Sequence, residues 1–174
     1  MKFYLIGMPG CGKTTTGKLI ASQANLKFLD LDDQIIARAG KSINEIFIQD
    51  GEDHFRSLEQ NQLQEVSKEY NNILLATGGG APCFFDNMEF MNLTGHTIYL
   101  SVDPGNLVDR LLIYGTAERP LLKDRSKEDL LGEINLKLKT REKFFSRAHV
   151  IIDYNKIDPV KVLNAIRDLK EKPG

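Results

Sequence analysis

The chain has 174 residues, with 23 Lys and Arg against 24 Asp and Glu, so its formal net charge at pH 7 is −1. This balance does not favour bulk electrostatic binding to nucleic acid or to an anionic membrane, so we expect neither partner, and any anion site must be local. A domain of this length buries a sufficient core without a disulfide, so Cys11 and Cys83 need not pair. The apolar run after Met1 is too short for a signal peptide or a membrane span, and we expect a cytoplasmic protein.

Short apolar runs alternate with longer periodic segments along the whole chain. This alternation predicts an α/β fold, with a five-stranded parallel sheet and helices on both faces. The expected strands are residues 3–6, 27–29, 73–76, 97–100 and 150–152. The expected helices include residues 13–24, 104–114 and 159–170, and further helix starts at Ser42 and Ser126, each followed three residues later by an acidic residue.

The segment 114–125 interrupts this alternation. It has neither a helical nor a strand period, and it contains Gly115 and Pro120. We therefore expect a mobile surface segment between two helices.

The strongest local signal follows the first expected strand. Residues 7–14, GMPGCGKT, match the pattern G-x-x-x-x-G-K-[ST] and lead directly into a helical segment. In such a loop the backbone N–H groups surround phosphate oxygens, while the lysine reaches the terminal phosphates and the hydroxyl ligates Mg²⁺. We expect ATP to contact a contiguous run of residues: Gly10, Cys11, Gly12, Lys13, Thr14 and Thr15.

A carboxylate pair follows the second expected strand. Asp30 and Asp32 are two residues apart, so in extended geometry they point the same way, one toward a metal ion and the other toward a phosphoryl acceptor. In the alternative, these carboxylates only cap and charge a helix N-terminus. The pair alone does not decide between the two.

The third expected strand ends in three glycines, Gly78, Gly79 and Gly80. Bare backbone at the carboxyl end of a strand allows a ligand to approach closely, although an isolated triple glycine is equally a tight loop. A guanidinium binds a carboxylate or phosphate bidentately, so Arg56 and Arg141 are candidates to hold an anionic acceptor, and Arg119 could reach the same edge from the segment 114–125.

Taken together, these motifs resemble the shikimate kinase family over nearly the whole chain. The matching segments are GMPGCGKTT at 7–15, FLDLD at 28–32, SINEIF at 42–47, DGEDHFRSLE at 50–59, TGGGA at 77–81, RPLL at 119–122, and Arg141 in the penultimate helix. The resemblance implies one P-loop kinase domain over 1–174, of the nucleoside monophosphate kinase type. It also implies a substrate-binding helical segment at about 32–60 and a lid at about 114–125. The implied reaction converts shikimate and ATP to shikimate 3-phosphate and ADP in aromatic amino-acid biosynthesis.

The resemblance also assigns roles on the nucleotide side. It makes Lys13 a catalytic phosphate ligand and Arg119 a catalytic lid arginine over the phosphates, and it implies that Arg110 and Arg119 both bind ATP. One Mg²⁺ ion would be held by Thr14 and, through water, by Asp30. Some relatives have an arginine against adenine near residue 156, where this chain has Lys156 and Ile157, so base selectivity stays open.

On the acceptor side the resemblance makes Asp32 the residue on the reacting hydroxyl. Arg56 and Arg141 become the clamp on the shikimate carboxylate. The set implied to border shikimate is Asp32, Arg56, Gly78, Gly79, Gly80 and Arg141. Phe47 and Phe55 could wall this pocket, whereas Phe84 and Phe85 are expected to serve packing.

Two alternatives stay open. A related kinase could phosphorylate gluconate or a nucleoside monophosphate, because an arginine clamp by itself also suits those acceptors. A catalytically silent nucleotide-binding switch would not need Asp32, Arg56 or Arg141, and all three are present. We expect a monomer, and we interpret His54, His96 and His149 as ordinary surface or core residues because they lack metal-ligand spacing.

Cys11 supports one further hypothesis. It lies between two glycines at a helix N-terminus and next to Lys13, where a thiolate is stabilised. We expect it either to react preferentially with thiol reagents, with protection by ATP, or to be an inert loop thiol.

Overall fold

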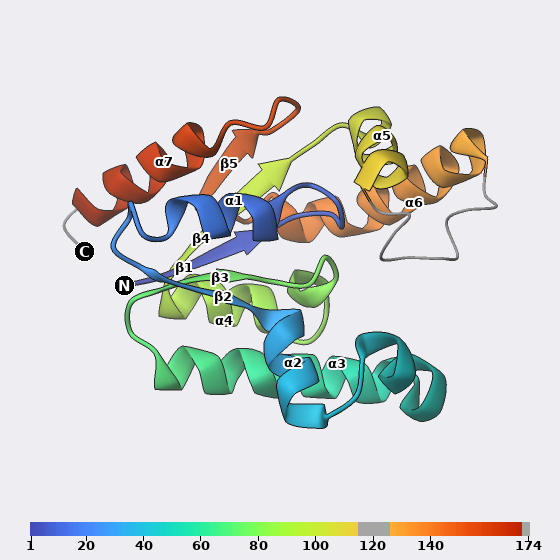
Figure 1. Cartoon of the computed structure of the whole chain (residues 1–174), viewed down its shortest axis with the longest axis horizontal. Coiled ribbons are helices and arrows are strands. Elements are labelled where there is room, and N and C mark those ends of the chain that lie inside the picture. Colours follow the sequence, from blue (N-terminus) through green and yellow to red (C-terminus); the bar gives the residue numbers. More distant parts are fainter. Residues whose placement is uncertain (115–125, 172–174) are drawn as a thin grey trace.

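A computed structural model describes residues 1–114 and 126–171, and strands and helices alternate through these ranges (Figure 1). The strands are β1 (Lys2–Ile6), β2 (Lys27–Asp30), β3 (Ile73–Ala76), β4 (His96–Ser101) and β5 (Val150–Asp153). The helices are α1 (Lys13–Ile20), α2 (Leu31–Ala39), α3 (Ile43–Glu69), α4 (Asn87–Thr94), α5 (Pro104–Tyr114), α6 (Lys127–Phe145) and α7 (Pro159–Glu171), with a 3₁₀ turn η1 (Ala81–Cys83). Each predicted strand is confirmed to within a residue at each end.

The sheet has five strands in the order β2-β3-β1-β4-β5, and every neighbouring pair is parallel. All five carboxyl ends therefore lie at one edge of the sheet. β1 is central, with β3 on one side and β4 on the other, so the chain reverses its direction of progress at β1. In open α/β sheets a ligand binds at the carboxyl edge beside this switch point.

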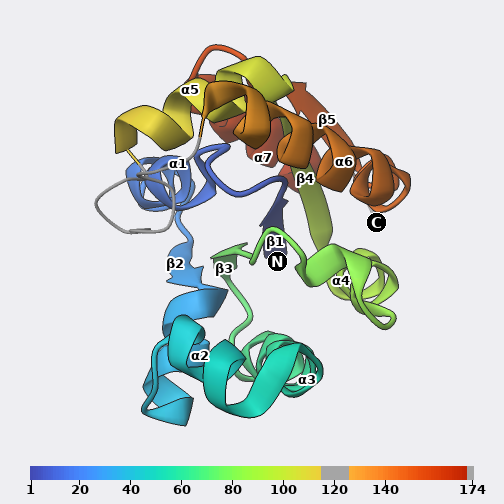
Figure 2. The same ribbon diagram turned by 90° about the vertical axis from the view of Figure 1, so that its right-hand side faces the viewer.

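The three central strands, β3, β1 and β4, are buried on both faces, which explains their continuous apolar runs. Residues Phe3–Ile6 of β1 and Ile73–Leu75 of β3 have no exposed surface. α1 and α7 pack together on one face, and α4 lies on the other (Figures 1 and 2). The predicted doubly wound α/β fold is confirmed.

α2 and α3 pack against each other below the β2–β3 side of the sheet (Figure 2). Ser42 caps α3 in the predicted capping box, accepting from Glu45 N while the Glu45 carboxylate accepts from Ser42 N. The backbone of α3 is kinked at Gly51, whose φ of 84° and ψ of 171° are not helical. The segment 32–60, which we expected to bind substrate, thus consists of α2 and the first two thirds of the kinked helix α3.

Two expectations need comment. The first helix ends at Ile20, earlier than predicted, and the chain continues through turns to Asn25, where φ is 52°. Of the segment 114–125, only Tyr114, the last residue of α5, lies within the described residues; Arg119 lies outside them.

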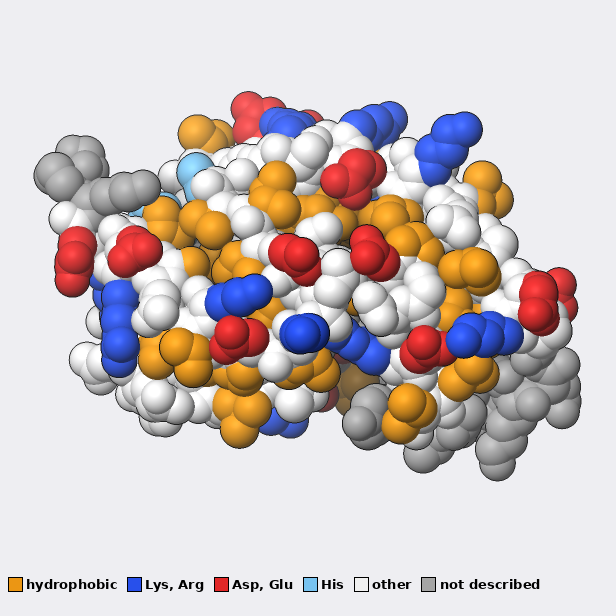
Figure 3. Space-filling view, turned by 90° about the horizontal axis from the view of Figure 1, so that it is seen from above, with side chains coloured by type: hydrophobic (Ala, Val, Ile, Leu, Met, Phe, Trp, Pro, Cys, Tyr) orange, Lys and Arg blue, Asp and Glu red, His pale blue; other side chains and the backbone are white. Residues whose placement is uncertain are grey.

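The face on which α7 lies carries acidic and basic side chains interspersed with apolar ones (Figure 3). Among the described residues on this face, charges of both signs are interspersed. Within the described residues, no helix is long and apolar enough to cross a membrane.

Candidate active site

The Gly-rich loop 7–12 joins the central strand β1 to α1. Gly7 and Gly12 have φ values of 142° and 104°, in a region that disfavours residues with a Cβ atom. A methyl group at Gly7 would also lie 2.9 Å from Leu100 O. Gly12 is the N-cap of α1, so the loop delivers the N–H groups of a helix N-terminus to the carboxyl edge of the sheet.

Lys13 turns back over this loop. Its Nζ donates to Gly7 O at 2.9 Å and to Met8 O at 3.0 Å, and the residue is only 8% exposed. Its charge is thus satisfied by the carbonyls of the loop itself. Gly10 and Thr15, two other residues expected to contact ATP, lie exposed beside it.

Thr14 and Asp30 bring the loop and the end of β2 together. Thr14 Oγ1 donates to Asp30 Oδ2 at 2.7 Å, and Asp30 Oδ1 accepts from Asp32 N at 3.0 Å, which makes Asp30 the N-cap of α2. The expectation that Asp30 and Asp32 share extended geometry is wrong, because the strand ends at Asp30 and Asp32 lies in the first turn of α2. The Asp30 carboxylate therefore both caps α2 and accepts a hydrogen bond from Thr14.

A hydroxyl beside a carboxylate offers hard oxygen ligands, which suit Mg²⁺. Within residues 1–114 and 126–171 no group of three His, Cys, Asp or Glu side chains could hold a metal ion. The Thr14–Asp30 pair therefore fits an ion that takes most of its ligands from water and phosphate rather than from a protein cage.

Arg110 also contacts the loop, from α5. Its guanidinium donates to Cys11 O at 3.0 Å, to Tyr154 O at 2.7 Å and to Asn155 O at 2.9 Å. It thereby ties the phosphate loop to the segment that follows β5. Lys156 and Ile157, where some relatives have an adenine-contacting arginine, are exposed in that same segment.

Arg56 lies in α3 and is 8% exposed. NH1 donates to Glu59 Oε2 at 2.7 Å, while Nε and NH2 donate to Glu52 Oε1 at 3.3 Å and 3.1 Å. The Phe84 ring lies 4.1 Å from its Cζ atom, and the Phe55 ring lies 4.9 Å away. Phe84 was expected only to pack, but it covers this guanidinium.

Glu59 is fully buried, and burial raises the pKa of its carboxyl group above the usual value, although the Arg56 charge offsets part of this rise. A methyl group at Gly78 would lie 2.5 Å from Glu59 Oε1 and 3.2 Å from Asp32 Oδ1. The two carboxylates therefore face the same glycine. Sequence reasoning did not assign roles to Glu52 and Glu59, although their positions four before and three after Arg56 put them on the same helix face.

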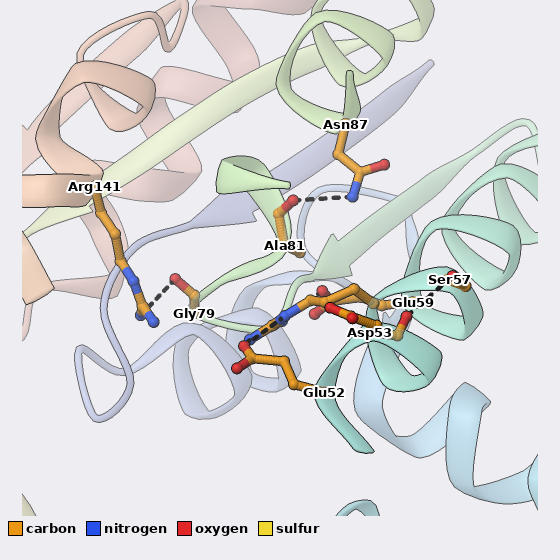
Figure 4. A network of polar contacts seen from close by, with 9 residues as sticks. Glu52, Asp53, Ser57, Glu59, Gly79, Ala81, Asn87 and Arg141 are labelled. Atoms are coloured by element: carbon orange, nitrogen blue, oxygen red, sulfur yellow. Dashed lines mark hydrogen bonds and ion pairs between the residues drawn. The ribbon is translucent and has the colours of Figure 1, made fainter. Parts of the chain in front are cut away.

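The three glycines after β3 lie between the two arginines. Arg141, from α6, donates to Gly79 O at 3.0 Å, and burial lowers the pKa of its guanidinium (Figure 4). Gly80 abuts the Arg56 guanidinium, since a methyl group there would lie 2.9 Å from both NH1 and NH2. A hydrogen bond of 3.0 Å from the Asn87 side-chain amide to Ala81 O fixes the residue that follows these glycines (Figure 4).

The glycine loop also touches the phosphate loop. A methyl group at Gly79 would lie 2.5 Å from Pro9 Cδ and 2.9 Å from Pro9 N. The structure thus brings together every described residue of the predicted site. Arg119 lies outside the described residues, so its predicted place is not addressed.

The remaining cysteine and histidine predictions have mixed outcomes. Cys11 is fully buried, so it lacks the exposure that preferential labelling requires, and burial raises the pKa of the half-buried Cys83 thiol to about 11. The histidines are not all scattered: His96 and His149 lie with ring centroids 5.6 Å apart, away from the phosphate loop. Two imidazoles without a further described ligand do not make a metal site.

The fold and this site define the class of protein. A phosphate-binding loop after the central strand, a buried lysine, and paired arginines over a second Gly-rich loop are the features of a P-loop kinase that acts on a small molecule.

Comparisons with known proteins give the family. The shikimate kinase family model matches residues 9–170. A shikimate kinase of Parabacteroides distasonis is 46% identical over 90% of this chain and 89% of its own. The crystal structure of shikimate kinase from Bacteroides thetaiotaomicron has a TM-score of 0.88 and 41% identity, covering 98% of this chain and 97% of that one. The enzyme of Acinetobacter baumannii, solved in complex with shikimate, has a TM-score of 0.82 and 33% identity, with 97% and 92% covered. The chain belongs to the shikimate kinase family.

Proposed function

We propose that this protein transfers the γ-phosphate of ATP to the 3-hydroxyl of shikimate, giving shikimate 3-phosphate and ADP in aromatic amino-acid biosynthesis. The observation that carries the proposal is the convergence of Arg56 and Arg141 on the loop Gly78–Gly80, directly beside the phosphate loop. A carboxylate-bearing acceptor can lie between those arginines with a hydroxyl near the phosphates. The family and its shikimate-bound relative support this acceptor.

On the nucleotide side, the N–H groups at the start of α1 would bind the phosphates, and Lys13 would leave its loop carbonyls to neutralise them. Residues Gly10–Thr15 supply this contact, and Arg110 holds the loop in place from behind. Thr14 and Asp30 would hold Mg²⁺, Asp30 through water, and the ion supplies charge neutralisation between the terminal phosphates when bound.

On the acceptor side, Arg56 and Arg141 would bind the carboxylate of shikimate, and the Gly78–Gly80 backbone would border its ring. Asp32, whose carboxylate faces Gly78, would accept a hydrogen bond from the 3-hydroxyl. Phosphoryl transfer passes through a loose transition state, so orientation of the hydroxyl matters more than the basicity of Asp32. Arg119, in the segment 114–125, would add positive charge next to the phosphoryl group during its transfer.

The decisive experiment is an acceptor panel. ADP release with Mg·ATP is measured against shikimate, gluconate, AMP and CMP, and the phosphorylated product is identified by mass and NMR. Turnover should depend on shikimate and be negligible with the other three. Absence of shikimate-dependent turnover in a folded protein that binds ATP would refute the assignment.

We also propose that the protein is a cytoplasmic monomer. Its two cysteines are free, as expected in a reducing compartment. Sedimentation velocity at several protein concentrations tests the oligomeric state, and a mass that rises with concentration would contradict a monomer.

A further inference from the structure

The two carboxylates on Arg56 differ sharply in their surroundings. Glu59 has 1% of its side chain exposed and takes the NH1 donor, whereas Glu52 has 55% exposed and takes the Nε and NH2 donors. Glu59 is fixed in the protein interior. Glu52 is an exposed carboxylate that accepts hydrogen bonds from one edge of the buried Arg56 guanidinium.

The other approaches to this guanidinium are occupied by the protein. Its NH1–NH2 edge lies against Gly80, where even a methyl group would be only 2.9 Å away. Phe84 lies 4.1 Å from the guanidinium carbon. Among the described residues, the partner of Arg56 that borders solvent is Glu52, so the Nε–NH2 edge is the one open to a carboxylate that arrives from outside.

We propose that Glu52 is an internal stand-in for the carboxylate of the acceptor. It occupies the Nε–NH2 edge of Arg56, and an acceptor must displace it in order to bind there. The inference rests on the proposed function, because it requires an acceptor that carries a carboxylate. Glu52 thus sets the affinity and selectivity of the clamp without touching the reacting atoms.

The backbone at this point suits displacement. Glu52 is the first residue after the kink at Gly51, whose positive φ only glycine adopts easily, and no atom lies within 4 Å of the position of a Gly51 Cβ. The exposed Glu52 side chain can therefore leave Arg56 for water without disturbing the core. An exchange of one carboxylate for another also keeps the buried guanidinium paired at every stage, which avoids the large cost of an isolated buried charge.

This arrangement gives selectivity. A weakly bound anion that makes one contact cannot compete with a tethered carboxylate, whereas an acceptor that also engages Arg141 and the glycine loop can. Removing the stand-in should therefore tighten the binding of a carboxylate-bearing acceptor.

The test compares Glu52→Gln with a matched control, Asp53→Asn, which removes the same charge from the next, exposed residue. Calorimetry measures the Kd of shikimate and of its neutral methyl ester, in the absence of turnover. We expect Glu52→Gln to bind shikimate about threefold to fivefold more tightly, as for partly exposed ion pairs. Glu52→Gln should not bind the methyl ester comparably more tightly than the unaltered protein does. Asp53→Asn should not bind shikimate comparably more tightly either. In kinetics the change should fall on the KM for shikimate more than on kcat.

Weaker or unchanged shikimate binding by Glu52→Gln overturns the inference, because Glu52 would then orient Arg56 instead of blocking it. Equal gains in Glu52→Gln and Asp53→Asn also overturn it, since they would reflect general charge. The proposed function is judged separately, by shikimate-dependent ADP release in the unaltered protein. If Glu52→Gln tightens shikimate binding but the unaltered protein does not phosphorylate shikimate, the inference about Glu52 holds and the proposed reaction is wrong.

Discussion

Thr14 and Asp30, which belong to two different motifs, are joined by a hydrogen bond of 2.7 Å from Thr14 Oγ1 to Asp30 Oδ2. The bond links the phosphate loop to the cap of α2, the helix that carries Asp32. In the proposed reaction, the Asp30 carboxylate would therefore connect the nucleotide side of the site with the helix that positions Asp32 at the acceptor hydroxyl.

The first prediction concerns that carboxylate. Asp30→Asn keeps a good helix cap but removes the charge that would hold Mg²⁺ through water, so we expect Mg·ATP affinity to fall by about 10- to 100-fold. ATP titrations with Mg²⁺ and with EDTA check this. An equal loss under both conditions would mean that Asp30 acts on the loop and not on the metal.

The second prediction concerns the clamp. Arg56→Ala and Arg141→Ala should each weaken acceptor binding while sparing ATP, because breaking a buried charge pair costs about 2–5 kcal/mol. Arg38→Ala, which removes an exposed partner of Glu65, is the matched control and should change neither affinity. Shikimate and ATP titrations decide the matter; unchanged shikimate affinity in both clamp variants would remove them from the clamp.

The third prediction concerns the contact between the two Gly-rich loops. Gly79→Ala places a methyl group 2.5 Å from Pro9 Cδ and should push the loops apart. A misplacement of this kind costs about 10²-fold in kcat/KM. Gly105→Ala, where nothing lies within 4 Å of the new methyl group, is the control. Thermal melts of both variants separate a site effect from unfolding; wild-type kinetics in a folded Gly79→Ala would show that the contact is dispensable.

The phosphate loop could be predicted from sequence because its function depends on a contiguous set of residues. The strands could be predicted because a sheet that is buried on both faces requires unbroken apolar runs. The partners of Arg56 could not be ranked from sequence. Glu52 and Glu59 have equivalent helical spacing. The packing of η1 against α3 and the close approach of Gly78 to Glu59 bury Glu59, whereas Glu52 stays exposed.

Contacts between residues that are far apart in the sequence could not be predicted either. Asn87 holds Ala81, and Arg110 reaches carbonyl groups on both sides of the nucleotide edge, through contacts that no local pattern encodes. Asp30 shows the opposite case: its role as a cap could be anticipated, but the direction of its side chain relative to that of Asp32 could not, because α2 begins at Leu31, directly after Asp30.

The fourth prediction concerns the thiols. Burial raises the pKa of Cys83 to about 11, so its reactive thiolate is scarce at neutral pH and becomes abundant only as the pH approaches that value. Labelling of the native protein should be slow at pH 7 and should rise about tenfold per pH unit up to pH 10. Mass spectrometry of the labelled peptides follows both sites. Rapid, ATP-sensitive labelling of Cys11 at pH 7 would show that its burial is readily opened.

The fifth prediction concerns Arg119. An arginine brought over the phosphates when both substrates are bound stabilises the transition state more than the ground state. Arg119→Ala should therefore lower kcat by about 10³-fold or more, with a much smaller loss of ATP affinity, and Arg119→Lys should recover only part of the activity. Steady-state kinetics beside ATP titrations test this. If kcat holds while ATP binding collapses, Arg119 is a ground-state nucleotide contact.

The contacts of Lys13 bear on how ligands of this protein are detected. Its ammonium group donates to Gly7 O and Met8 O, so a nucleotide that recruits Lys13 exchanges these hydrogen bonds for phosphate contacts instead of adding to them. The heat released and the rise in melting temperature on binding then reflect the difference between Lys13 bonded to its loop and Lys13 bonded to phosphate. A calorimetric screen that ranks ligands by heat alone can consequently place nucleotides below inhibitors that leave Lys13 on its loop, whereas the thermal shift follows the ligand concentration relative to Kd.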